Sequence, residues 1–109
     1  MPQIKVRGIQ LDKLASGSEK LVNELVKIVE CPKDYFELEY IQSVAIRDGE
    51  IQDAYPFIEV AWFDRGLEIQ DKVAAALTRF AHNIGVENID IAFVTFEERK
   101  YYENGKHFG

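Results

Sequence analysis

The chain begins with the stretch Met1-Pro2-Gln3-Ile4-Lys5-Val6-Arg7-Gly8, and the rest of the sequence is organised around it. Apolar and charged side chains alternate from Ile4 to Arg7, and a period of two residues is typical of a β-strand. Pro2 directly follows the initiator methionine. If Met1 is removed, Pro2 becomes a secondary amine at the start of a strand.

The pattern of this first strand returns in the middle of the chain, at Ile58-Glu59-Val60. Each copy precedes a stretch with helical periodicity and a second predicted strand, Phe36–Ile41 after the first copy and Ile89–Val94 after the second. Such units pair their strands in parallel through a right-handed crossover. We therefore expect an α+β fold in a single domain, residues 1–109, with tandem β-α-β units forming a four-stranded mixed sheet and two helices on one face.

The first amphipathic helix is predicted over Leu11–Glu30, where apolar residues recur at helical spacings. Asp12 or Ser16 is expected to cap its N-terminus. Cys31-Pro32 ends the helix, because proline disfavours helical geometry in the residue before it. Since Cys31 is the only cysteine, there is no intrachain disulfide and no cysteine metal cluster, and we interpret this residue as a small buried hydrophobe.

The middle of the chain is predicted to form strands. Residues Asp34–Ile46 are expected to form one long strand, which returns through the tight turn Asp48-Gly49. The run Phe57–Phe63 is nearly continuously apolar and is typical of a strand that is covered on both faces. Its one acidic residue, Glu59, is expected to contact a basic group.

The second helix carries its apolar face from Ile69 to Ile84, with Gly85 as its C-terminal cap. After the strand Ile89–Phe96, the aromatic segment Tyr101–Phe108 contains Asn-Gly and predicts a short C-terminal hairpin. The sheet face opposite the helices, with Trp62 and many other aromatic residues available to it, indicates an oligomer. A neighbouring subunit would give the aromatic hairpin something to pack against.

The composition is that of a soluble globular domain, with 47% hydrophobic and 29% charged residues in 109. There is no apolar run long enough to span a bilayer and no signal peptide, so we expect a cytoplasmic protein that does not bind membranes. The formal net charge of -6 would repel a phosphate backbone, which excludes nucleic acid as an expected partner. A local basic pocket for a small anion is compatible with that charge.

The Met1-Pro2 start on a strand, the two tandem units and the length together resemble the tautomerase superfamily, whose members include 4-oxalocrotonate tautomerase and macrophage migration inhibitory factor. Three stretches are similar to a small bacterial group of unassigned function within it: Tyr55-Pro56-Phe57, Trp62-Phe63-Asp64-Arg65-Gly66 and Tyr101–Phe108. The resemblance covers essentially the whole chain. One departure is the start of the first helix, where several members carry an arginine and this chain has Gly8-Ile9-Gln10-Leu11.

The resemblance implies a homotrimer with a central barrel of sheets and three sites, each between adjacent subunits. Pro2 would be the general base of a keto-enol tautomerase that needs no cofactor and no metal, and Arg65 would anchor the carboxylate of a small anionic substrate. The other substrate-binding residues that it implies are Tyr101, Tyr102 and Asn104, close to the neighbour's proline, and Lys33. The reaction type stays open between isomerisation, dehalogenation, decarboxylation and none.

A free N-terminal amine has a pKa of about 7.7 to 8.0, which burial lowers, so it can accept a proton from a carbon next to a carbonyl near pH 7. While Met1 remains attached, the nitrogen of Pro2 is an amide and base catalysis is impossible. The alternative is a non-catalytic oligomeric scaffold or a small-ligand-binding protein, in which Pro2 is tolerated at the first residue of a strand. In that reading Arg65 is a surface residue paired with Asp64 or Glu68.

Overall fold

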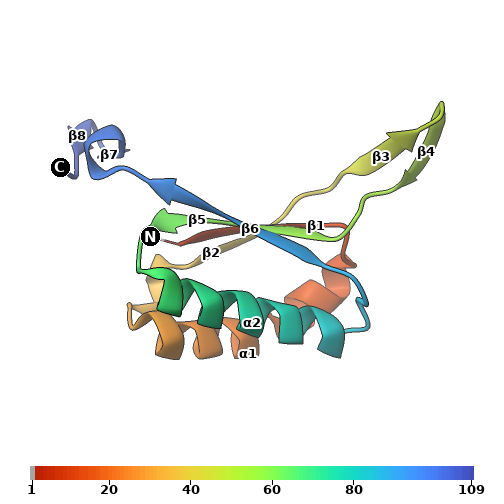
Figure 1. Cartoon of the computed structure of the whole chain (residues 1–109), viewed down its shortest axis with the longest axis horizontal. Coiled ribbons are helices and arrows are strands. Elements are labelled where there is room, and N and C mark those ends of the chain that lie inside the picture. Colours follow the sequence, from red (N-terminus) through yellow and green to blue (C-terminus); the bar gives the residue numbers. More distant parts are fainter. Residues whose placement is uncertain (1) are drawn as a thin grey trace.

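The computed structural model describes residues 2–109. Figure 1 shows one sheet with two helices packed against one face and a hairpin projecting from each end. The elements in chain order are β1 (Gln3–Arg7), α1 (Leu11–Val29), the short 3₁₀ helix η1 (Lys33–Tyr35), β2 (Glu37–Tyr40), β3 (Val44–Arg47), β4 (Glu50–Asp53), β5 (Phe57–Phe63), α2 (Leu67–Asn83), β6 (Asp90–Phe96), the 3₁₀ helix η2 (Glu98–Lys100), β7 (Tyr102–Glu103) and β8 (Lys106–His107).

The central sheet contains four strands in the order β2-β1-β5-β6. Strand β1 is parallel to β2, and β5 is parallel to β6, so each β-α-β unit pairs its own strands in parallel. The two units meet through β1 and β5, which are antiparallel. The predicted mixed sheet of tandem β-α-β units, with both helices on one face, is confirmed (Figure 1).

The core lies between this sheet and the two helices. The antiparallel register puts Ile4 opposite Val60 and Val6 opposite Ile58, and these four side chains are 1% exposed. The helices contribute side chains at spacings of three, four and seven, and those of α1 that are buried are Leu14, Leu21, Leu25 and Val29. The apolar spacing in the sequence therefore places both helices on the sheet, because only one stripe of each helix needs to leave water.

Helix α1 begins earlier than its predicted caps. Gln10 occupies the N-cap position and makes no side-chain hydrogen bond, whereas Asp12 and Ser16 both lie inside the helix. The start is set by the tight turn at Gly8, which has a φ of 76°, and by Ile9, which is only 5% exposed. At the other end the helix stops before Cys31-Pro32, as predicted.

The predicted long strand Asp34–Ile46 is wrong as a single element. Its first residues form η1, and it is interrupted between β2 and β3. The last hydrogen bond to β1 runs from the N–H of Ile41 to the carbonyl of Val6, at 2.7 Å. Strand β1 ends at the next residue, so residues 42 and 43 have no neighbouring strand with which to pair.

The chain then forms the hairpin β3–β4, which projects from one end of the molecule (Figure 1). Asp48 and Gly49 close it with φ angles of 51° and 80°, which confirms the predicted tight turn. The predicted C-terminal hairpin β7–β8 is confirmed as well, and Asn104 and Gly105 have the same left-handed geometry, with φ angles of 51° and 85°. Gly85 likewise ends α2 with a φ of 91°.

The face of the sheet opposite the helices is here called the open face. Its side chains on β5 include Phe57, Glu59 and Phe63, which are half-buried, so β5 is fully covered on the helix side only. Trp62 points the other way, toward the helices, and is 1% exposed, which corrects its expected place on the uncovered face. The prediction of a strand covered on both faces is therefore not met within one protomer.

Glu59 lies opposite Lys5 in the register of the open face, and Glu39 flanks Lys5 on its other side. The three ion pairs among residues 2–109 are elsewhere, on the helices and near η2: Lys72–Glu68, Arg79–Glu24 and Lys100–Glu97. Glu59 thus faces a basic residue across the strands but does not form an ion pair with it.

None of the helices in residues 2–109 has the length and apolar character that crossing a bilayer requires.

Candidate active site at the amino-terminal proline

Pro2 is the first described residue and its side chain is fully buried. Its carbonyl accepts a hydrogen bond from the N–H of Glu37, at 3.0 Å, which ties it to the start of β2. Gln3 pairs with Ala61 on β5, so the next step of the antiparallel register brings Pro2 beside Trp62. A proline is acceptable here because the first residue of a strand does not need to donate to the sheet.

Cys31 lies at the same end of the molecule and belongs to the hydrophobic core. Burial raises the pKa of the Cys31 thiol, while the positive charge of Arg65 acts in the opposite direction. The guanidinium of Arg65 is therefore within electrostatic reach of the end of α1. Cys31 is 8% exposed, and its interpretation as a small buried hydrophobe is confirmed.

Arg65 follows β5 and lies two residues before the first residue of α2. Its side chain is half-buried, and none of the three ion pairs among the described residues involves it. As a surface residue, Arg65 was expected to pair with Asp64 or Glu68, but both carboxylates have other partners. Asp64 accepts a hydrogen bond from the N–H of Gly66 at 2.9 Å, and Glu68 pairs with Lys72 at 3.6 Å. The guanidinium is thus available to an anion.

Lys33 opens the 3₁₀ helix η1, two residues after Cys31, and is exposed. Its backbone carbonyl accepts a hydrogen bond from the N–H of Phe36, at 3.2 Å, which closes the turn into β2. The fold therefore brings the chain at Pro2, Cys31, Lys33 and Arg65 to one end of the sheet.

Tyr101 belongs to an aromatic cluster at this end, which the sequence did not reveal. Its ring centroid lies 5.1 Å from that of Phe63, 5.0 Å from Phe96 and 4.9 Å from Phe108. The N–H of Phe108 donates to the carbonyls of Glu98 and Tyr101, both at 3.1 Å. These bonds fold the C-terminal segment back onto the ends of β5 and β6, beside a hollow of about 430 Å³ that Phe96 and Tyr101 help to line.

The other two C-terminal candidates lie in the β7–β8 hairpin, outside this cluster. The hydroxyl of Tyr102 accepts a hydrogen bond from Arg99 at 2.7 Å, and its side chain is 55% exposed. Asn104 is an exposed turn residue whose left-handed backbone is required by the hairpin. Neither side chain lines the hollow beside Tyr101.

Two further features were missed in the sequence. The indole N–H of Trp62 is buried and has no hydrogen-bond partner among residues 2–109. A buried unpaired donor destabilises a fold, and this one lies beside Pro2 in the register. The second feature is the aromatic cluster itself. The sequence feature that could have predicted the cluster is the position of Phe63 and Phe96, which pair with each other at the ends of two parallel strands.

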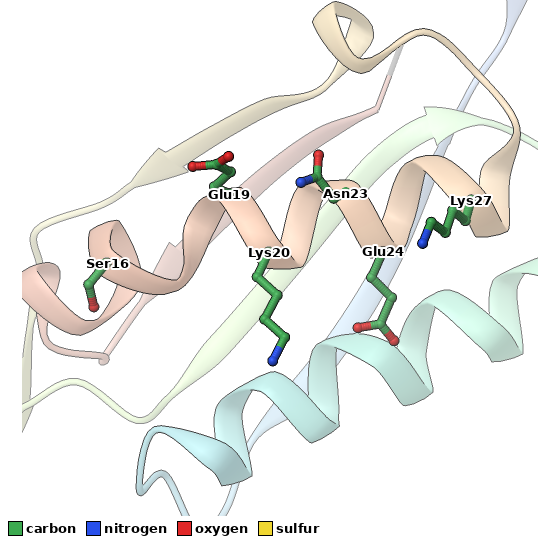
Figure 2. A pocket seen from close by; sticks show the side chains of 6 residues that line it. All are labelled: Ser16, Glu19, Lys20, Asn23, Glu24 and Lys27. Carbon is green, nitrogen blue, oxygen red and sulfur yellow. The ribbon is translucent and has the colours of Figure 1, made fainter.

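A larger hollow, of about 480 Å³, lies on α1 and is shown in Figure 2. Its labelled side chains all come from one helix, and Lys20 and Glu24 reach toward α2 (Figure 2). The carboxylate of Glu24 is paired with Arg79. This surface is a solvated helix face, so we place the candidate site at Pro2. Among the described residues, no group of three or more His, Cys, Asp or Glu side chains is arranged to hold a metal ion.

The chain has the fold of tautomerase-like and macrophage migration inhibitory factor-like proteins. Solved structures share this fold at low sequence identity. A macrophage migration inhibitory factor-like protein from Entamoeba histolytica is 14% identical over 98% of this chain and 96% of its own, with a TM-score of 0.70. A fused 4-OT described as an asymmetric trimer is also 14% identical, over 96% and 94%, with a TM-score of 0.73.

A third such structure, of a protein inactivated by 2-oxo-3-pentynoate, is 13% identical over 98% of this chain and 94% of its own, with a TM-score of 0.73. No curated protein matches the chain. The family is nevertheless clear. The chain belongs to the family described as domain of unknown function DUF1904, which matches residues 1–107.

Two solved structures are more similar to this chain. The DUF1904 domain from Sebaldella termitidis is 42% identical over 99% of this chain and all of its own, with a TM-score of 0.90. A protein of unknown function from Vibrio cholerae is 26% identical over 98% and 87%, with a TM-score of 0.83. The chain thus belongs to a family of unassigned function whose fold is that of tautomerase-like proteins.

Proposed function

We propose that this protein is a cofactor-independent, tautomerase-like isomerase of a small 2-oxo acid or enol, and that Pro2 is its general base. Once Met1 has been removed, the Pro2 nitrogen is a secondary amine in an apolar environment, which favours its neutral form. The neutral amine takes a proton from the carbon next to the substrate carbonyl and returns it to the other end of the enolate. The removal of Met1 concerns a residue outside the described part of the chain.

One observation carries this proposal: at one end of the sheet lie a fully buried Pro2 and a half-buried Arg65 that pairs with no carboxylate among residues 2–109. A guanidinium binds a carboxylate in bidentate fashion, and it also favours the negative charge that develops on an enolate oxygen. Arg65 is thus suited to hold the anionic end of the substrate. Lys33 at the same end adds a second positive charge for a small anion.

The proposal includes a homotrimer in which the C-terminal segment of a neighbour completes each site. The fused 4-OT that shares the fold is described as an asymmetric trimer, and the open face of this protomer needs a cover. Tyr101, Tyr102 and Asn104 are the residues that we assign to substrate binding from that segment. A protein of the same fold is inactivated by 2-oxo-3-pentynoate, which supports a 2-oxo acid as the substrate class. A cytoplasmic location is part of the same proposal.

A second candidate function is a non-catalytic oligomeric scaffold or a small-ligand-binding protein. The observation that favours it is the burial of the Pro2 side chain, which is among the fully buried ones together with Ile4 and Trp62. A proline ring buried in this way contributes to packing whether or not its nitrogen reacts. In this case Pro2 would be kept for stability alone.

The test is a keto-enol interconversion assay on a panel of 2-oxo acids, with wild type, Pro2→Ala and Arg65→Gln. Pro56→Ala is the matched control, because Pro56 precedes β5 at the opposite end from Pro2. We expect Pro2→Ala to slow the reaction about 100-fold, the scale of a lost general base, and Arg65→Gln to raise KM. An unchanged rate in Pro2→Ala would remove Pro2 from the mechanism and favour the scaffold.

A further inference from the structure

A hollow of about 260 Å³ lies between the two helices and is here called the interhelical hollow. It differs from the hollow of Figure 2, which is lined by α1 alone. Its floor is apolar and comes from both helices, with Leu21 from α1, Phe80 from α2 and Ile84 at the end of α2. Leu21 belongs to the hydrophobic core, and the other two are half-buried and pack against it. An edge of the core is therefore open to a ligand.

Gly17 allows the two helices to approach each other at this hollow. A Cβ atom at this position would lie 2.6 Å from Cε1 of Phe80, which is closer than real Cβ contacts. Glycine inside a helix is less favourable than alanine. Here it gives the Phe80 ring room against α1, so that the ring contributes a planar apolar surface to the interhelical hollow.

Two contacts between the helices hold this hollow in shape. Near the start of α1, the ammonium of Lys13 donates to the carbonyl of Ile84, at 3.3 Å. Further along α1, Glu24 pairs with the guanidinium of Arg79. Both contacts join α1 to the second half of α2, so the hollow is formed by the packing of the helices before a ligand binds, as is usual for small-molecule sites.

The charge around the interhelical hollow is positive, although the whole chain has a formal net charge of -6. Among residues 2–109, Glu24 is the only carboxylate that lines it, and Arg79 neutralises that charge. Lys20 reaches toward α2 (Figure 2), and neither Lys20 nor Lys13 belongs to the three ion pairs of the described residues. Two ammonium groups without a carboxylate partner beside an apolar floor favour a ligand with an apolar body and a negative charge.

We propose that the interhelical hollow binds a small aromatic carboxylate. The ring of the ligand packs on the floor against Phe80, and its carboxylate pairs with the ammonium of Lys20. The amide of Asn83, which also lines the hollow, donates to the same carboxylate. The volume lies slightly below the roughly 300 Å³ at which typical small-molecule sites begin. It therefore suits a ligand with a single ring.

This ligand site is separate from the candidate active site. Pro2 precedes β1, whereas Lys13, Gly17 and Lys20 lie on α1, which follows the other end of that strand. The helices cover the face of the sheet opposite the open face (Figure 1). A neighbouring subunit on the open face would leave the interhelical hollow accessible. The inference thus concerns an additional site and does not depend on catalysis at Pro2.

Heteronuclear NMR titration of the full chain with benzoate tests the site, and benzamide is the neutral probe of the same shape. We expect saturable shifts of the backbone amide signals of Gly17, Lys20 and Phe80, with a Kd on the order of 1 mM for a ligand of one ring. Benzamide should bind about 5-fold more weakly, because it lacks the ion pair. The absence of saturable shifts at Gly17 and Phe80, or shifts confined to Cys31 and Arg65, would overturn the proposal.

Lys20→Gln and Lys27→Gln separate the ion pair from a general effect of net charge. Lys27 lies on the same helix and lines the hollow of Figure 2, but it does not line the interhelical hollow. Lys20→Gln should weaken benzoate binding about 5-fold and leave benzamide binding unchanged, whereas Lys27→Gln should change neither. Equal effects of the two substitutions on benzoate would contradict its pairing with Lys20.

Gly17→Ala and the flexible carboxylate hexanoate test the apolar floor. The added Cβ displaces the Phe80 ring, so Gly17→Ala should weaken the binding of benzoate and benzamide severalfold and to the same extent. Hexanoate should bind to wild type more weakly than benzoate, because it has no ring to pack on Phe80. Circular dichroism checks that the variant is folded. Unchanged benzoate binding in folded Gly17→Ala, or tighter binding of hexanoate, would contradict an aromatic ligand on this floor.

Discussion

The ring of Tyr101 packs edge-on against that of Phe63, with 5.1 Å between the ring centroids. Phe63 is the last residue of β5, two positions before Arg65. The C-terminal segment is therefore held against the strand that delivers the candidate anion-binding residue. This contact is made within one protomer, so the aromatic ending of the chain packs against the end of its own β5.

Tyr101→Ala should destabilise the fold, whereas Tyr101→Phe should not. Alanine removes an aromatic ring from a cluster of four, at a cost of about 2 to 4 kcal/mol for a half-buried aromatic side chain. Phenylalanine keeps the ring contacts. Urea unfolding of both variants measures the difference. Equal stabilities of the two variants would show that the cluster does not hold the C-terminal segment.

A loss of activity in Tyr101→Phe at unchanged stability would have a different meaning. It would assign the hydroxyl, and not the ring, a part in substrate binding. The same pair of variants therefore separates the packing role of Tyr101 from its proposed role in the site.

Gly8→Ala should be among the most destabilising single substitutions in the chain. Gly8 has a φ of 76°, and a Cβ there would lie 2.7 Å from the backbone of Tyr55. The backbone cannot move away as a flexible side chain can. We therefore expect the free energy of unfolding to fall by about 3 kcal/mol. Gly49→Ala is the matched control. Its φ of 80° is similar, but nothing lies within 4 Å of its Cβ.

In Gly49→Ala the free energy of unfolding should fall by only about 1 kcal/mol, the cost of a left-handed backbone conformation. Denaturant titration of both proteins checks this prediction. Equal losses in the two variants would mean that the close approach between Gly8 and Tyr55 is unimportant.

The proximity of Arg65 to Cys31 can be measured through the reactivity of the thiol. The positive charge of Arg65 lowers the pKa of Cys31 against the larger effect of burial. Arg65→Gln removes that charge, so the pKa should rise further and alkylation by iodoacetamide should shift to higher pH. Lys100→Gln, which alters a cation of η2, is the control. Identical pH profiles for wild type and Arg65→Gln would contradict the inference that the Arg65 guanidinium lies close to the Cys31 thiol.

The same burial of Cys31 predicts how stability changes in alkali. Burial raises the pKa of the thiol in the folded protein above its ordinary value, which is about 8.5 in an unfolded chain. The stabilising contribution is complete below the unfolded pKa and is lost as the pH rises through the folded pKa. Cys31→Ala should therefore show a weaker fall of unfolding free energy above about pH 8.5 than wild type. Parallel curves for the two proteins would contradict this account of Cys31.

Much of the fold follows from side-chain periodicity, because one buried stripe per helix and one buried face per strand leave a direct trace in the sequence. Ile4 and Val6 on one side, and Lys5 and Arg7 on the other, are sufficient to define β1. The break after β2 is different. Ile41 leaves the sheet because β1 has ended, and the length of a partner strand is not encoded in the residues of β2.

The site was predictable only in part, for a similar reason. Pro2 and Arg65 were proposed from the resemblance to the tautomerase superfamily, and their roles in the site stay predictions. The cluster of Phe63, Phe96, Tyr101 and Phe108 depends on the parallel register of β5 and β6. Trp62 was expected on the open face, yet it shares the face of Val60, two residues before it, and therefore faces the helices.

Catalysis by Pro2 requires a free amine, so the intact mass of the protein purified from its native cells should show that Met1 has been removed. The chain is then expected to begin at Pro2. A mass that retains Met1 would contradict this expectation, because an amide nitrogen has no basic lone pair and could not take the proton.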